Sequence, residues 1–277
     1  MSRVLRISSR NARFQQWESL LSNSGKRQRA GEFLVQGVRP ISLAAQFGWR
    51  FRALIYDADR PLSSWAETML RDVDTVRVSM SPGLLAELGE KDEGSPELVA
   101  VIEMPADDLG RIRVSRDFLG VVLDRPASPG NIGSIIRSAD ALGAAGVIIT
   151  GHGADAYDPR SVRASTGSLF ALPVVRGPSH RELAAWVAAQ RARGCPIAVV
   201  GTDERGEADV FDFDFTQPTL LLVGNETVGL SAGWREFCDR TVKIPMTGSA
   251  SSLNAANAAT VVLYEIARQR LLRGRRR

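Results

Sequence analysis

Two short apolar runs near the C-terminus each end in a loop of small and polar residues. The runs cover residues 219–223 and 241–244, and their length and branched side chains are typical of buried parallel strands. The loops cover residues 224–227 and 245–249, and each contains a glycine, which lets a backbone approach a ligand closely. Ligands of open α/β sheets bind outside the carboxyl ends of the strands, so this pair of loops predicts a binding site.

The C-terminal half of the chain alternates between such apolar runs and segments of helical period. A polar start at residues 251–254 leads into a long helix that is predicted to end near Arg270. This alternation predicts a parallel sheet covered by helices on both faces. The predicted strands are residues 118–124, 146–150, 196–201, 219–224 and 241–245, with a helix at 134–142 after a loop.

The N-terminal part has shorter elements. Residues 1–30 show no clean period and are predicted to form one helix with a flexible lead. The charged segment 107–114 reads as a linker. We therefore expect a small α/β domain at residues 1–106, a linker at 107–116 and a second domain at 117–277. The small domain is predicted to have strands at 32–37, 51–56, 76–78 and 98–104 and helices at 38–47, 64–71 and 82–88.

Composition and charge narrow the class of protein. No apolar run approaches the roughly 20 residues of a membrane helix, and the N-terminus lacks the apolar core of a signal peptide. Two cysteines do not make a disulfide framework, so we expect a cytoplasmic protein. The first 30 residues hold seven basic residues and one acidic residue, and the last ten hold six arginines. Basic ends favour a polyanionic partner, although solvated termini have the same composition.

Candidate chemistry appears first at residues 131–137. Asn131 and Arg137 flank Gly133 at a predicted strand-to-helix turn. Arg137 lies among apolar residues of the predicted helix, so we expect its guanidinium to be partly buried and to need an anionic partner. A ligand phosphate or carboxylate meets that need, and so does an intramolecular pair with a glutamate.

Three motifs occur in order along the second half of the chain. They are NxGxxxR at 131–137, LLVGNETVGLS at 221–231 and IPMTGSASSLNAANAAT at 244–260. With this set, residues 118–270 resemble the SpoU (TrmH-type) branch of the SPOUT methyltransferases. FLVQGVRPISLAA at 33–45 resembles the family's L30e-like substrate-binding domain. The chain is most similar to the rRNA-modifying resistance enzymes of antibiotic-producing actinomycetes, such as the avilamycin and thiostrepton resistance methyltransferases.

The resemblance implies a fold, an activity and partners. The implied fold is a C-terminal parallel-sheet α/β domain with a deep trefoil knot, preceded by a smaller L30e-like α/β domain that binds the RNA substrate. The implied reaction is S-adenosylmethionine-dependent 2′-O-methylation of a ribose in RNA by a homodimer. The separate N-terminal domain favours 23S rRNA as the substrate, with tRNA as the alternative. Resistance to a ribosome-targeting antibiotic is the biological role that the resemblance suggests.

The resemblance also implies site residues. Glu226 matches an acidic residue placed to hold Arg137 or the RNA. The implied catalytic residues are Asn131, Arg137, Glu226, Ser252 and Asn254. The implied cofactor-binding residues are Thr202, Val223, Gly224, Asn225, Ile244, Met246, Ser252 and Leu253.

The implied reaction requires few groups. A ribose 2′-hydroxyl attacks the methyl carbon of a sulfonium in line, so positioning supplies much of the acceleration. The hydroxyl must also lose its proton or have its developing charge stabilised. The family proposal makes the matching arginine the base. Because a guanidinium stays protonated in proteins, the alternative is that Arg137 orients a phosphate and stabilises the alkoxide.

Other patterns in the sequence give weaker indications of function. GHGADA at 151–156 fits a dinucleotide-binding pattern, but Asp158-Pro159 is expected to interrupt any helix there. The histidines and cysteines lack the clustering of metal ligands, so no metal is expected. The small-residue loop at 163–168 is compatible with substrate contact or with packing. A catalytically silent RNA-binding protein of the same fold is the second hypothesis, and the presence of all five catalytic candidates speaks against it.

Overall fold

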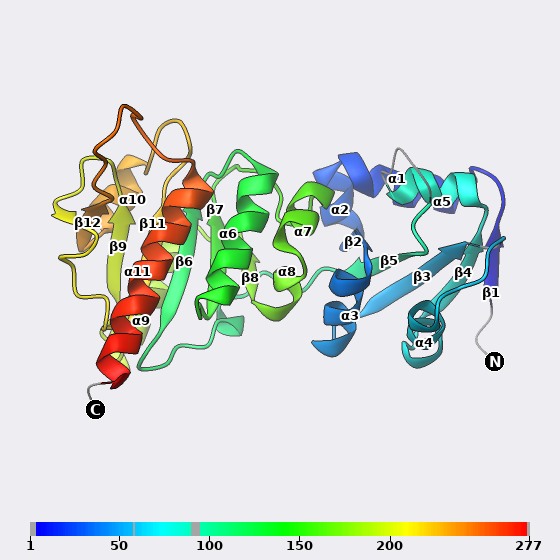
Figure 1. The fold of residues 1–277 in the computed structure, drawn as a ribbon, viewed down its shortest axis with the longest axis horizontal. Coiled ribbons are helices and arrows are strands. Elements are labelled where there is room, and N and C mark those ends of the chain that lie inside the picture. Colours follow the sequence, from blue (N-terminus) through cyan, green and yellow to red (C-terminus); the bar gives the residue numbers. More distant parts are fainter. Residues whose placement is uncertain (1–3, 58, 90–94, 276–277) are drawn as a thin grey trace. The chain divides into compact units, whose positions relative to one another are not determined.

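The computed structural model describes residues 4–57, 59–89 and 95–275, and Figure 1 shows the order of the elements. The chain divides into two compact units. Unit 1 contains Met1–Pro105 together with Tyr157–Ala171, and unit 2 contains Ala106–Ala156 together with Leu172–Arg277. The second unit is therefore not the continuous segment that the sequence pattern predicts.

Unit 1 is built on a five-stranded mixed sheet. Its strands are β1 (Val4–Ile7), β2 (Glu32–Gln36), β3 (Phe51–Asp57), β4 (Val76–Met80) and β5 (Leu98–Glu103). Their order is β1-β4-β3-β5-β2, with β5 antiparallel to both of its neighbours and the other pairs parallel. The predicted single helix over residues 1–30 is wrong, because β1 forms there. Pairing with β4 holds this strand of four residues in place, and the sequence of β1 by itself does not predict a strand.

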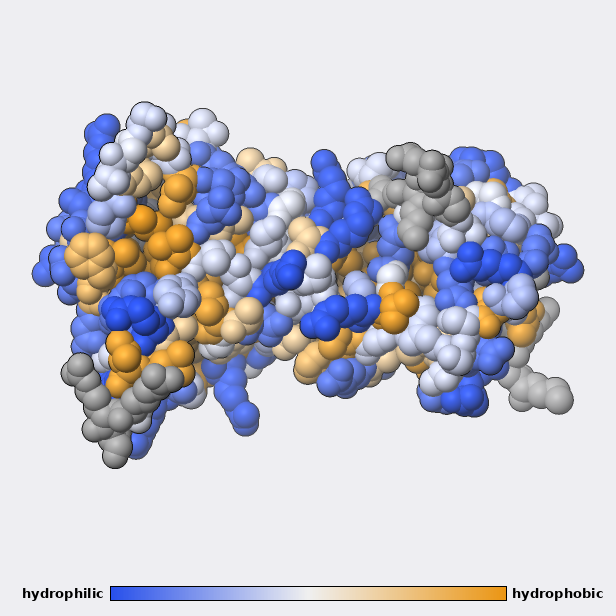
Figure 2. Space-filling view, viewed as in Figure 1, coloured by the Kyte–Doolittle hydropathy of each residue, from blue (hydrophilic) through white to orange (hydrophobic). Residues whose placement is uncertain are grey.

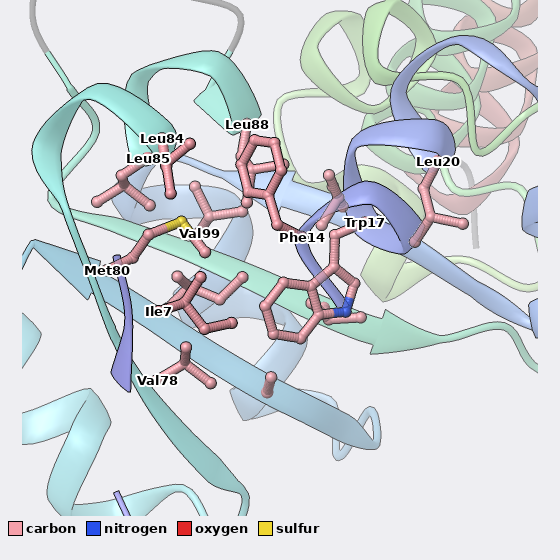
Figure 3. Close-up of a cluster of buried hydrophobic side chains, with 14 residues drawn as sticks. Ile7, Phe14, Trp17, Leu20, Val78, Met80, Leu84, Leu85, Leu88 and Val99 are labelled. Carbon is pink, nitrogen blue, oxygen red and sulfur yellow. The ribbon is translucent and has the colours of Figure 1, made fainter. Parts of the chain in front are cut away.

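Seven helices belong to unit 1 among the described residues. They are α1 (Ala12–Ser22), α2 (Ser24–Ala30), α3 (Val38–Gln46), α4 (Ser64–Asp72), α5 (Pro82–Gly89), α7 (Pro159–Ser165) and α8 (Ser168–Ala171). Asn23 separates α1 from α2, and its side chain caps α2 by accepting from the Lys26 amide at 2.9 Å. Phe14 and Trp17 of α1 pack with Leu85 of α5 and Val99 of β5 in one apolar cluster, shown in Figure 3.

The segment that contains α7 and α8 packs within unit 1 through aromatic contacts. The rings of Phe33 and Tyr157 lie 4.7 Å apart, and the Trp49 indole donates a hydrogen bond of 2.9 Å to the Phe170 carbonyl. The predicted interruption at Asp158-Pro159 is confirmed: no helix opens at 151–156, and α7 starts only at Pro159. Asp158 is the N-cap of α7, and Pro159 occupies a first-turn position where its missing N–H costs nothing.

The predicted linker at 107–116 is folded into unit 2. It contains a 3₁₀ turn, η1 (Leu109–Arg111), and Ile112 is buried. Arg111 donates a hydrogen bond of 3.0 Å to the Val174 carbonyl, and Asp107 pairs with Arg176 at 2.9 Å. These contacts make the charged segment part of the unit that follows it.

Unit 2 contains a seven-stranded sheet whose strands are all parallel, as predicted. The strands are β6 (Leu119–Asp124), β7 (Gly146–Thr150), β8 (Val174–Arg176), β9 (Ala198–Thr202), β10 (Ala208–Asp209), β11 (Thr219–Val223) and β12 (Arg240–Lys243). Their order is β10-β12-β9-β11-β6-β7-β8. The sequence pattern does not reveal β8 and β10, because runs of three and two residues carry no period.

The longer helices of unit 2 pack against this sheet. They are α6 (Pro129–Ala141), α9 (His180–Ala192), α10 (Ala232–Phe237) and α11 (Ala255–Arg275). Leu183 of α9 and Trp234 of α10 join an apolar cluster with Val122 and Leu222 of the sheet. Helices α6 and α11 lie side by side in Figure 1, and the hydroxyls of Ser138 and Thr260 are 2.7 Å apart between them.

Two helix boundaries matter for the site. Helix α6 begins at Pro129, not at residue 134 as predicted, because the Ser128 side chain accepts from the Asn131 amide and caps the helix. Asn131 and Gly133 therefore lie in the first turns of α6. Helix α11 extends to Arg275, beyond the predicted end. No helix in the described parts of the chain is both long and apolar enough to cross a membrane.

Candidate active site

A pocket of about 310 Å³ opens at the carboxyl ends of β9, β11 and β12. The three loops that follow these strands form most of its lining, together with the start of α11. All eight predicted cofactor residues line this pocket: Thr202, Val223, Gly224, Asn225, Ile244, Met246, Ser252 and Leu253. The sheet brings together segments more than 50 positions apart because its parallel strands end at the same edge.

Charged residues that the sequence pattern does not single out also line the pocket. Asp203 and Glu204 directly follow β9, and Arg235 lies on α10. The Asp203 carboxylate pairs with Arg235 at 3.0 Å, and the Asp203 side chain is 14% exposed. The position of Asp203 two residues after the predicted strand at 196–201 is a usable signal, whereas nothing local to Arg235 predicts its place.

The Glu226 carboxylate is bound by the start of α6. It accepts hydrogen bonds from the amides of Ala127 at 2.9 Å and Ser128 at 3.3 Å. It also accepts one of 2.9 Å from the side-chain amide of Asn131. The resemblance implied Arg137 or the RNA as the partner of Glu226. Among the described residues Glu226 does not contact Arg137, and it holds the N-terminal turn of α6. A carboxylate suits this place because free amides and the helix dipole favour negative charge there.

Burial raises the pKa of Glu226, but the hydrogen bonds from Ala127, Asn131 and Ser128 lower it by more, so the net pKa lies below the usual value. An ionised carboxylate with its oxygens occupied is a poor proton acceptor. Glu226 therefore serves to hold the two loops together.

Asn254 connects the third motif to the first. Its side-chain N–H₂ donates to the Asn131 side-chain oxygen at 3.2 Å, and its own side-chain oxygen accepts from the amides of Ala256 at 2.9 Å and Asn257 at 3.4 Å. Asn254 thus caps α11 and orients Asn131. Ser252 is exposed and lines the pocket two residues earlier.

Arg137 departs from the prediction. It is exposed, whereas the sequence pattern predicts a partly buried guanidinium. Helical geometry explains the difference: Ile132, Ile136 and Ala139 take the buried positions of α6, and residue 137 falls outside that stripe. Arg137 lies six residues from Asn131, about 9 Å along the helix axis. Within the described residues its guanidinium has no hydrogen bond or ion pair, so its cation is available to an external anion.

The small-residue loop at 163–168 packs inside unit 1. Ser165 and Ser168 are buried, and the Ser165 hydroxyl donates to the Val162 carbonyl at 2.8 Å. A Cβ on Gly167 would lie 2.5 Å from a methyl group of Leu43, and the φ of Gly167 is +99°. The structure therefore favours packing over substrate contact for this loop. GHGADA at 151–156 opens no helix, since the next one begins at Pro159.

Comparison with known proteins places these features in a family. Residues 119–264 match the SpoU rRNA Methylase family, and residues 11–100 match the SpoU L30e-like domain. The 23S rRNA (uridine(2479)-2′-O)-methyltransferase of Streptomyces viridochromogenes is 69% identical over 266 residues, covering 96% of this chain and 93% of that protein. The 23S rRNA (guanosine(2553)-2′-O)-methyltransferase RlmP of Bacillus subtilis is 28% identical over 259 residues, covering 94% and 97%.

Solved structures agree with this match. The crystal structure of the SpoU methyltransferase AviRb from Streptomyces viridochromogenes, in complex with AdoMet, aligns with a TM-score of 0.92 at 69% identity and covers 95% of this chain and 99% of that one. An AdoMet-bound rRNA methyltransferase from Sinorhizobium meliloti aligns with a TM-score of 0.82 at 28% identity, covering 96% and 98%. The chain therefore belongs to the SpoU rRNA methylase family and carries the SpoU L30e-like domain at its N-terminal end.

Proposed function

We propose that this protein transfers a methyl group from S-adenosylmethionine to the 2′-oxygen of a ribose in 23S rRNA. One observation carries the proposal: the eight cofactor candidates line one pocket, and the hydrogen-bonded cluster of Asn131, Glu226 and Asn254 borders it through the 224–229 loop and the start of α11. The 69% identical relative is named as a 2′-O-methyltransferase of uridine in 23S rRNA, which supports the same substrate class here.

The pocket suits a cationic ligand of adenosyl size. Its volume of about 310 Å³ lies at the lower end for small-molecule sites. Val223, Ile244 and Leu253 offer apolar walls. The carboxylates of Asp203 and Glu204 bring negative charge to a site for a sulfonium and an ammonium, and the Arg235 guanidinium offsets that of Asp203 only. S-adenosylmethionine supplies the electrophilic methyl carbon when it is bound. The loops of this chain hold and orient it.

The residues around the pocket have separate roles in the proposed reaction. Asn131 has a fixed amide orientation, since it accepts from Asn254 and donates to Glu226. Arg137 is the exposed cation on the same helix and is assigned to the RNA. Because Glu226 is occupied and a guanidinium stays protonated, the geometry favours Arg137 as a clamp for a phosphate and a developing alkoxide over Arg137 as a base.

Transfer of a labelled methyl group to purified 23S rRNA tests this function. The product should contain one phosphodiester bond, 3′ of the target nucleotide, that resists alkaline hydrolysis, because a methylated 2′-oxygen cannot attack it. A methyl group recovered on a mononucleotide after complete alkaline digestion would refute ribose methylation. Transfer to tRNA and not to 23S rRNA would show that tRNA is the substrate.

We assign a homodimer to the proposed enzyme, with α11 at its interface. Helix α11 carries exposed apolar residues at helical spacing: Val261 at 40%, Tyr264 at 61%, Leu271 at 67% and Leu272 at 41% exposure. Figure 2 shows hydrophobic atoms in orange beside the grey C-terminal residues, over the last turns of α11. Exposed apolar side chains on one face of a helix favour an association site. Light scattering at micromolar concentration should give the dimer mass, and a monomer would refute the assignment.

Four further assignments rest on the family resemblance. Unit 1 recognises the RNA, and the basic residues of α2 and of the start of α3, Lys26, Arg29 and Arg39, are exposed on it. The C-terminal segment forms a deep trefoil knot around the pocket. The enzyme acts in the cytoplasm, where rRNA is made, and the modification protects the ribosome from an antibiotic. Deletion of the gene should then raise antibiotic sensitivity together with loss of the methyl group.

A further inference from the structure

The turn that forms one wall of the pocket is anchored by two residues outside the pocket. The turn covers residues 225–229, and the amides of Asn225 and Gly229 each donate to the other's carbonyl, at 3.1 and 3.0 Å. The Asn225 side-chain oxygen accepts from the amides of Thr227 and Val228 at 2.9 and 3.2 Å. The residues of this turn line the pocket, whereas Asp124 and Arg125 do not.

Asp124 and Arg125 contact the turn and the residues after it at three points. The Arg125 carbonyl accepts from the Asn225 side chain at 2.7 Å, and the Arg125 guanidinium donates to the Gly229 carbonyl at 3.4 Å. The Asp124 carboxylate accepts from the Ser231 amide at 2.8 Å. The same carboxylate, which is 2% exposed, accepts two hydrogen bonds from Arg125 at 3.0 and 3.1 Å.

The backbone of Arg125 is strained to make these contacts. Its φ is +51°, in the left-handed region that L-residues other than glycine rarely adopt. Its amide still donates to the Thr150 carbonyl at 3.0 Å, while its carbonyl turns towards Asn225. Glycine would adopt this conformation without strain, but it would lack the guanidinium that joins Asp124 to Gly229. Strain of this kind persists where the surrounding contacts impose it, and such places cluster at functional sites.

We propose that Asp124 and Arg125 are positioning residues that set the affinity for S-adenosylmethionine by fixing the turn at 225–229. They act through the turn and do not line the pocket themselves. This inference deepens the proposed function and rests on it for the identity of the ligand. The attachment of the turn at 225–229 to Asp124 and Arg125 is present in the protein without ligand, so it can be tested separately from cofactor binding.

Three variants and a control test the proposal. Arg125→Gly removes the guanidinium and relieves the backbone strain, Arg125→Lys keeps the charge but loses the two-pronged contact, and Asp124→Asn places an amide against the guanidinium. Arg193→Ala removes an exposed arginine at the end of α9, the matched control. Calorimetric titration should show cofactor affinity about 10-fold weaker in Arg125→Gly, with a partial recovery in Arg125→Lys and no change in the control.

Amide hydrogen exchange of the ligand-free protein gives the independent readout. Arg125→Gly should speed exchange in the peptide that covers residues 225–231 while the melting temperature stays near that of the wild type. Turnover at saturating S-adenosylmethionine should fall by less than the affinity does. Unchanged exchange in folded Arg125→Gly and Asp124→Asn would overturn the proposal, and so would unchanged cofactor affinity. A wild-type protein that does not bind S-adenosylmethionine would refute the proposed function, and the exchange result would still decide the attachment.

Discussion

The side-chain amide of Asn131 donates a hydrogen bond of 2.9 Å to the carboxylate of Glu226, across 95 positions of sequence. This bond joins the first residue of one motif to the acidic residue of another and places the start of α6 against the 224–229 loop. Because the Ala127 and Ser128 amides complete the coordination of Glu226, the carboxylate is an organiser of the site.

Replacement of Glu226 should reveal this role as a dependence of stability on pH. The pKa of Glu226 is lower in the folded protein than in the unfolded chain, where it is about 4.3. Its contribution to stability is therefore complete above pH 4.3 and is lost as the pH falls through the folded pKa. Glu226→Gln should lower the free energy of unfolding by about 1 kcal/mol at pH 7, a modest value because the group is exposed.

Urea denaturation of the wild type and Glu226→Gln at several pH values measures the difference. The two free energies of unfolding should converge as the pH falls through the lowered pKa of Glu226 in the folded protein. A difference that stays constant down to pH 3 would show that the carboxylate charge is not what stabilises the loops.

Replacement of Arg137 should separate turnover from cofactor binding. Arg137 is exposed and does not line the pocket, so Arg137→Ala should reduce turnover by orders of magnitude with little change in S-adenosylmethionine affinity. Arg137→Lys should not restore turnover, because a point charge does not reproduce the planar guanidinium. Single-turnover kinetics and calorimetry supply the two values. Loss of cofactor binding would contradict the assignment to RNA.

A chain shortened to begin near Arg111 should aggregate. Tyr157, Leu169 and Phe170 are buried within unit 1, and removal of residues 1–105 would expose them to water. We expect aggregation of this fragment and recovery of a folded fragment that binds the cofactor when residues 157–171 are also replaced by a flexible linker. Size-exclusion chromatography compares the two. Equal solubility of both fragments would show that these aromatic contacts do not matter for the second unit.

Arg270 should be a large local contributor to the stability of unit 2. Its guanidinium donates to the carbonyls of Phe215, Asp117, Phe118 and Gln217, and burial lowers its pKa. Arg270→Ala would leave these carbonyls without their donor, at a cost of about 2–4 kcal/mol. Arg273 donates one hydrogen bond, to the Thr216 carbonyl, so Arg273→Ala is the matched control and should lower the free energy of unfolding by less than about 1 kcal/mol. Chemical denaturation of both variants checks the difference.

Local pattern was sufficient for much of the fold. The apolar run at 219–223 is β11 as predicted, and the alternation of strands and helices correctly predicted the parallel sheet. Burial on both faces selects continuous apolar runs, and a parallel sheet places all strand ends at one edge. For that reason the sequence alone determined which loops meet, and the eight cofactor candidates lie together.

Only the tertiary structure decided the partners of individual side chains. Strand β1 exists because β4 pairs with it. Segment 157–171 packs in unit 1 because Phe33 and Trp49 contact Tyr157 and Phe170. Glu226 binds the start of α6 and leaves Arg137, one of the two partners implied for it by the resemblance, exposed. Periodicity and capping act over a few residues, whereas these choices depend on atoms about 70 to 120 positions apart that only packing brings within hydrogen-bonding range.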